Sequence, residues 1–149
     1  MHFDNPWRSY RQIAAQTASP GKLVLMLYEG AIRFLELARH GFTKDDPAEF
    51  NATISNNVLR AQEIITELRQ CLNRKEGGEL ATTMERLYEY MDYRLTQSNR
   101  LKEQDGIAEV LRRLTVLRDA WATMLQNQGT AGATHDPCAM DRLPELVAA

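Results

Sequence analysis

The stretch that decides the fold is Ser19-Pro-Gly-Lys-Leu-Val-Leu-Met-Leu-Tyr-Glu-Gly-Ala-Ile-Arg-Phe-Leu-Glu-Leu-Ala-Arg-His-Gly41. Ser19 can cap a helix by accepting a hydrogen bond from an otherwise unpaired amide, and Pro20 suits the first helical position because no partner exists there for an N–H. Apolar residues then recur every three or four positions. The pattern predicts a helix that ends near Gly41 and has a narrow polar edge, so other helices must cover most of its surface.

The same periodicity appears three more times along the chain. The periodic stretches, each with the residues that precede it, are 50–72 after Asp46-Pro47, 80–98 after Gly77-Gly78, and 107–125 after Asp105-Gly106. The connections between them are short, and short connections favour antiparallel neighbours. The sequence therefore predicts an all-α fold, an antiparallel up-down four-helix bundle.

A chain of 149 residues is long enough for one domain that buries a core without disulfides or metal. The organisation we expect is an N-terminal arm or cap segment at 1–18, the bundle at 19–127, and a flexible tail at 128–149 that lacks any hydrophobic period. Trp7 and Tyr10 would lie on one face of the arm if it were helical. Two large aromatic residues on a segment that precedes the predicted core raise the question of what this face contacts.

Composition excludes several classes of partner. A net charge of -2 gives no reason to expect nucleic acid or acidic lipid. The two cysteines form neither a disulfide framework nor a CxxC pair, which suits a reducing cytosol. The sequence shows no signal-peptide pattern, and no apolar run approaches the ~18–20 residues of a membrane span. We therefore expect a cytoplasmic protein that does not insert into a membrane.

No catalytic, cofactor-binding or metal-binding constellation is visible in the sequence. Glu36 and His40 are four residues apart on the polar edge of their helix, where a solvated pair is expected rather than a metal site. Phosphotransfer needs an exposed histidine in mid-helix, whereas His40 falls in the last turn. Cys71 lies on a mostly apolar edge, where a thiol is usually inert. We expect no enzyme activity, cofactor or metal.

The pattern also shows more apolar surface than one bundle needs. Tyr90 and Tyr93 lie off the core stripe of the third predicted helix, and Leu59, Ile64 and Cys71 lie off that of the second. Exposed apolar side chains on neighbouring helices can form a groove that receives another amphipathic helix. The sequence therefore suggests a protein that binds a partner helix.

Four blocks of the chain resemble the flagellar secretion chaperone family FliS. In order they are Asn5-Pro-Trp-x-x-Tyr10 with Thr17 to Ile32; Arg60-Ala-Gln-Glu-Ile-Ile-Thr-Glu-Leu68; Gly77-Gly-Glu-Leu-Ala81 with Leu87-Tyr-Glu-Tyr-Met91 and Arg94-Leu95; and Glu109-Val with Leu117-Arg-Asp-Ala-Trp121. The most specific are Ser-Pro-x-x-Leu-x-x-Met-Leu-Tyr-x-Gly-Ala in the first block and Gly-Gly-Glu-Leu-Ala in the third. Together the blocks cover about residues 5 to 125.

This resemblance implies an antiparallel four-helix bundle that acts as a cytoplasmic export chaperone. Its client would be the disordered C-terminal segment of flagellin, kept from premature polymerisation and delivered to the cytoplasmic domain of the flagellar type III export gate. Trp7 and Tyr10 would be the aromatic residues of the arm that dock on the gate. Candidates for lining the client groove are Ile54, Val58, Ile65, Leu87, Tyr88 and Met91.

Two other functions stay open at this point. One is a helical-bundle adaptor that associates with itself, for example as a homodimer, and the other is a histidine phosphotransfer domain. The first predicts a mass that rises with concentration and no binding of a flagellin peptide. The second predicts that His40→Ala abolishes phosphate acceptance.

Overall fold

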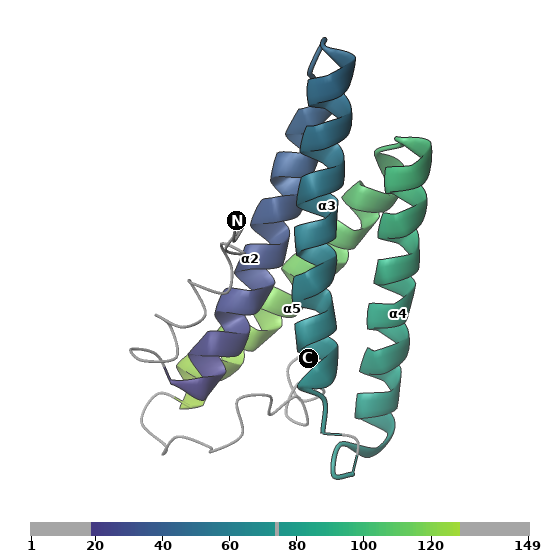
Figure 1. Cartoon of the computed structure of the whole chain (residues 1–149). Helices are drawn as coiled ribbons and strands as arrows, with labels where there is room; N and C mark the ends of the chain where they lie inside the picture. The colour runs from purple at the N-terminus through teal and green to yellow at the C-terminus, as the bar shows by residue number, and fades with distance from the viewer. Residues whose placement is uncertain (1–18, 74, 129–149) are drawn as a thin grey trace, which may run out of the picture.

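A computed structural model describes residues 19–73 and 75–128 of the chain. Within these ranges the helices are α2 (Pro20–Gly41), α3 (Pro47–Gln70), α4 (Gly78–Leu101) and α5 (Asp105–Gln128). Each helix runs opposite to the one before it, and the last returns to pack on the first (Figure 1). The arrangement is the predicted all-α, antiparallel four-helix bundle.

The predicted caps of the first two helices are present. The Ser19 hydroxyl accepts a hydrogen bond from the Lys22 amide at 3.3 Å, and Asp46 accepts one from the Glu49 amide at 3.0 Å. The fourth helix begins earlier than its apolar pattern, because Asp105 and Gly106 already belong to α5. The connection from α4 to α5 is therefore shorter than the apolar pattern suggests, which keeps these two helices adjacent.

The core lies along the centre of the bundle and is apolar, with a few aromatic side chains that carry polar atoms. Tyr28 and Tyr88 are fully buried and share a hydrogen bond of 2.6 Å between their hydroxyls, and burial raises the pKa of both groups. Trp121 is also buried, and its indole N–H donates to the backbone carbonyl of Gly21 at 2.6 Å. These bonds satisfy polar atoms that burial would otherwise leave without water.

Two glycines allow helices to approach closely. A Cβ at Gly30 would lie 3.3 Å from Cδ1 of Ile64, so this glycine sits where α2 packs tightly on α3. A Cβ at Gly106 would clash with the Ser98 hydroxyl and lie 2.8 Å from the carbonyl oxygen of Arg94. The first turn of α5 therefore packs directly on the backbone of α4.

The ends of the chain lie largely outside the described residues. The predicted arm at 1–18, with Trp7 and Tyr10, is wholly outside, and α5 includes Gln128, where the tail was expected to begin. The arm, the tail and their boundaries therefore stay predictions.

Candidate interaction surface

The predicted groove residues lie mostly inside the bundle. Those that are buried are Ile54, Val58, Ile65, Tyr88 and Met91, whereas Leu87 is half-buried against the core. They share the core stripes of α3 and α4, so a client would reach the buried ones only if these helices separated. Their assignment to a client groove stays a prediction.

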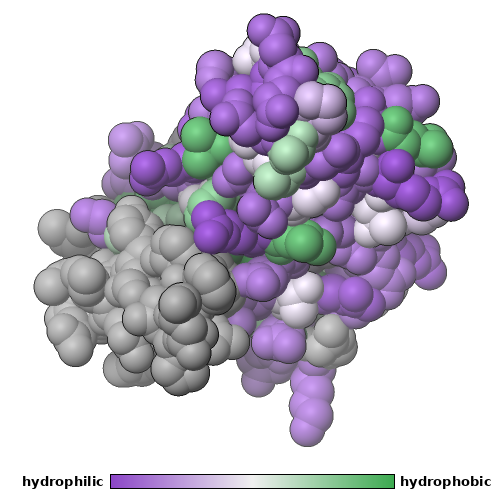
Figure 2. Space-filling model, turned by 45° about the horizontal axis from the view of Figure 1, so that its top comes forward, coloured by the Kyte–Doolittle hydropathy of each residue, from purple (hydrophilic) through white to green (hydrophobic). Residues whose placement is uncertain are grey.

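Other large apolar side chains are exposed. They are Leu37, Leu59, Tyr90, Tyr93, Leu101 and Val116. On the face shown in Figure 2, hydrophobic side chains form separate spots among hydrophilic ones rather than one continuous patch. A partner that used this face would need polar and apolar groups in alternation.

A groove of about 520 Å³ lies where α3 and α4 meet. Its lining is Asn51, Ser55, Leu59, Gln62, Thr96, Asn99, Arg100 and Lys102. Leu59 is the apolar residue among these and is 53% exposed. Tyr93, 62% exposed, precedes Thr96 and Arg100 by three and seven residues and so shares their face of α4. The groove thus combines amides and cations with one exposed apolar lining residue, Leu59, and a second exposed apolar residue, Tyr93, lies on the same face of α4.

Lys102 lines this groove just beyond the end of α4. It follows α4 in the left-handed conformation, with φ of 53°, and its ammonium donates hydrogen bonds to the Ser55 hydroxyl at 2.8 Å and to the side-chain oxygen of Asn99. The Ser55 hydroxyl also donates to Asn99 at 3.0 Å. Partial burial lowers the pKa of the Lys102 amine. The cation is therefore held between α3 and α4 by neutral oxygens.

Further along the same interface, polar bonds tie α3 to α4. The Gln62 amide donates to the backbone carbonyl of Asp92 at 3.2 Å and to its carboxylate at 3.0 Å. Arg69 forms ion pairs with Glu85 at 2.9 Å and Glu89 at 2.6 Å. These bonds set the register of α4 against α3, and with it the shape of the groove.

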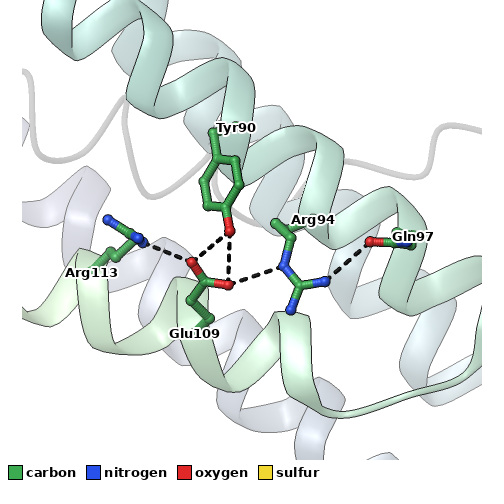
Figure 3. Close-up of polar contacts among 5 residues, drawn as sticks. All are labelled: Tyr90, Arg94, Gln97, Glu109 and Arg113. Atoms are coloured by element: carbon green, nitrogen blue, oxygen red, sulfur yellow. Dashed lines mark hydrogen bonds and ion pairs between the residues drawn. The ribbon is translucent and has the colours of Figure 1, made fainter.

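A second polar cluster joins α4 to α5 (Figure 3). The Glu109 carboxylate accepts hydrogen bonds from the Tyr90 hydroxyl at 2.8 Å and from Arg94 and Arg113, each at 3.0 Å. The guanidinium of Arg113 also lies 5.3 Å from the centre of the Tyr90 ring, and Arg94 reaches Gln97. The hydrogen bond from Tyr90, followed by those from the arginines, lowers the pKa of Glu109. This cluster clamps two helices and leaves Tyr90 only partly available to a partner.

Several other predicted features can be placed. His40 is exposed in the last turn of α2, where its backbone carbonyl accepts a hydrogen bond from the Thr43 hydroxyl at 2.7 Å. Within 19–73 and 75–128, no group of three or more His, Cys, Asp or Glu side chains is placed to hold a metal ion. None of the four helices combines the length and hydropathy needed to cross a membrane.

Comparison with known proteins identifies the family of this chain. The model of the family described as flagellar protein FliS matches residues 3–128, which is most of the chain. The chain belongs to the FliS family. It is 39% identical to the flagellar secretion chaperone FliS of Bacillus subtilis over 128 residues, which are 86% of this chain and 92% of that protein.

More distant relatives agree. Identity is 34% to the flagellar secretion chaperone FliS of Salmonella typhimurium, across 76% of this chain and 85% of that protein. Identity is 31% to the flagellar secretion chaperone FliS of Campylobacter jejuni, across 84% of this chain and 94% of that protein. FliS is a family of chaperones and not of enzymes. As a member of this family, the chain is a flagellar export chaperone.

The Lys102 cluster was not anticipated from the sequence. Ser55 and Lys102 are 47 residues apart and belong to no apolar pattern, so only the α3–α4 register brings them together. The available signal was weak: Leu59 lay off the core stripe of its helix, which indicated an exposed apolar group on the face that the groove occupies.

Proposed function

We propose that this protein is a cytoplasmic export chaperone that binds the disordered C-terminal segment of flagellin, prevents its premature polymerisation and helps deliver it to the flagellar type III export gate. Membership of the FliS family supports the class of function. The observation that supports client binding is the α3–α4 groove, with Leu59 in its wall and Tyr93 on the same side of α4. A disordered segment can fold as an amphipathic helix on such a surface.

The mode of binding follows from the exposed side chains. Leu59 and Tyr93 supply separated apolar anchors, and the amides between them can pair with polar groups of the client. Because the client must order itself on binding, its affinity stays below what the buried area alone would give. Moderate affinity suits a cargo that the chaperone must later release. Leu87, half-buried on α4, is the candidate from the predicted groove set that a client reaches with least rearrangement.

Delivery is the second half of the proposal. Trp7 and Tyr10, which lie outside the described residues, would dock the arm on the cytoplasmic domain of the export gate. Separate residues for client and gate would let one molecule hold both partners at once. A cytoplasmic location is part of the proposal, because flagellin must be met before it is exported.

Isothermal titration of the full chain with a flagellin C-terminal segment tests client binding. We expect saturable heat with the wild type and a loss of about tenfold or more in affinity for Leu59→Ser combined with Tyr93→Ser, because two apolar anchors are removed. The matched control is Leu37→Ser with Val116→Ser, which removes exposed apolar groups from α2 and α5 instead. Circular dichroism checks that both pairs keep the helical fold.

The titration also separates the alternatives. Absence of heat with the wild type, together with a mass that rises with concentration in light scattering, would favour the self-associating adaptor over the chaperone. Equal losses in the two double variants would show that client binding does not centre on the α3–α4 groove. His40→Ala should leave the titration unchanged, since His40 lies at the end of α2.

A further inference from the structure

The charge of the α3–α4 groove points to a feature of its occupant. Two of its lining residues, Arg100 and Lys102, are cationic, and none is acidic, although the whole chain carries a net charge of -2. Arg100 is exposed and has no ion pair within the part of the chain that the structure describes. A cationic groove in a slightly acidic protein favours an anionic group on the partner.

The bonding of Lys102 sharpens this requirement. Its ammonium has three N–H donors, and two of them bind the neutral oxygens of Ser55 and Asn99. Among residues 19–73 and 75–128, the third has no acceptor and the charge has no carboxylate partner. Partial burial lowers the pKa of this amine, so the charge is desolvated without a counter-ion. A carboxylate at this point would make a charge-assisted hydrogen bond and neutralise it.

We propose that the α3–α4 groove binds a side-chain carboxylate of the client through Lys102 and Arg100, and the next apolar side chain of the client on Leu59. The spacing follows from α3, on which Ser55, the partner of Lys102, lies one helical turn from Leu59. A client helix would thus present an Asp or Glu and an apolar residue about one turn apart. This inference rests on the proposed function and names the chemistry that the flagellin segment must carry at this site.

The test is a titration cycle with the full chain. Three proteins are compared. They are the wild type, a double variant that carries Lys102→Met and Arg100→Gln, and a control double variant that carries Arg33→Gln and Arg112→Gln. The control removes the same amount of charge from exposed positions on α2 and α5. The probes are a flagellin C-terminal segment and the same segment with every Asp and Glu replaced by Asn and Gln. The C-terminal amide of the natural segment is a third probe, which distinguishes a terminal carboxylate from a side-chain one.

We expect the Lys102 and Arg100 pair to weaken binding of the natural segment by about tenfold or more, and the control pair to weaken it by less than about threefold. The neutral segment should bind the wild type as weakly as the natural segment binds the Lys102 and Arg100 double variant. Binding of the neutral segment to that double variant should be only slightly weaker than either of these, because both changes remove the same interaction. A variant with Lys102→Arg and with Arg100 unchanged should keep most of the wild-type affinity for the natural segment. That result would show that the positive charge at position 102 matters, rather than the local backbone.

Three results would overturn the inference. If the affinity losses from the protein variant and from the neutral segment add, the two cations do not contact the client carboxylates. If the control double variant loses as much affinity as the Lys102 and Arg100 double variant, the effect comes from net charge and not from this groove. A loss confined to the amidated segment would assign the site to a chain terminus. In each case the proposed function would survive, whereas an absence of heat for the wild type with the natural segment would remove both.

Discussion

At the scale of single residues, Glu109 shows how one side chain serves two helices. Its carboxylate accepts from Tyr90 and Arg94 on α4 and from Arg113 on its own helix (Figure 3). The Glu109 side chain is only 19% exposed, so water screens these bonds less than it would on an open surface. The cluster therefore links α4 to α5 through a group that acid can neutralise.

This gives a prediction about pH. The folded-state pKa of Glu109 is lowered, so its stabilisation is complete above the ordinary carboxyl pKa of about 4.3 and is lost as the pH falls through the folded-state value. Glu109→Gln should reduce the free energy of unfolding by about 1 kcal/mol at pH 7. In urea titrations the variant and the wild type should converge in acid. A difference that persists unchanged at low pH would show that the loss comes from packing rather than from the charge.

Individual residues also mark the limit of what the sequence could predict. Tyr28 and Trp121 belong to periodic apolar stretches of the sequence, at 19–41 and 107–125, and both are buried as that pattern predicts. The resemblance to the FliS family proposed Ile54 and Val58 for the client groove, yet both are fully buried. Periodicity identifies an apolar face but not whether a neighbouring helix or a partner covers it. Leu59 was distinguishable because it left the stripe, and Lys102 was not, because its contacts depend on register.

At the scale of elements, the first turn of α5 lies directly against α4. Gly106 has no room for a side chain, because an added Cβ would meet the Ser98 hydroxyl and the Arg94 carbonyl oxygen. The sequence marked Asp105-Gly106 as a break between helices, whereas the structure begins α5 at Asp105. A glycine in a sequence usually indicates the end of a helix, whereas Gly106 lies inside α5 and allows a close contact with α4. The start of α5 could therefore not be predicted from the sequence.

Gly106→Ala should destabilise the bundle by about 1–3 kcal/mol, since a backbone carbonyl cannot move away as a side chain can. Thermal unfolding measures the loss. Adding Ser98→Ala removes one of the two obstructing groups and should recover only part of it. Full recovery would mean that the hydroxyl, and not the α4 backbone, limits the approach. No loss at all would show that the two helices are free to separate.

At the scale of the whole molecule, client and gate would use different parts of the chain. Changing Trp7 and Tyr10 together to Ala should leave the helical spectrum and flagellin binding largely intact while secretion of flagellin fails, because the arm is predicted to contact the gate and not to build the core. Circular dichroism, titration and an export assay measure the three properties. Loss of the helical spectrum would show that these aromatic residues belong to the core instead.

The hydrogen bond from Trp121 to the Gly21 carbonyl joins the beginning of the first helix to the last one, 100 residues later. Neither α3 nor α4 supplies that indole, so the Gly21 carbonyl gains this hydrogen bond only when α5 packs on α2. A nascent chain that lacks Trp121 can still pack α2 on α3, but it cannot form this bond. We expect a chain that ends before Trp121 to keep the packing of α2 on α3 and to lack the contact that joins α5 to the start of α2.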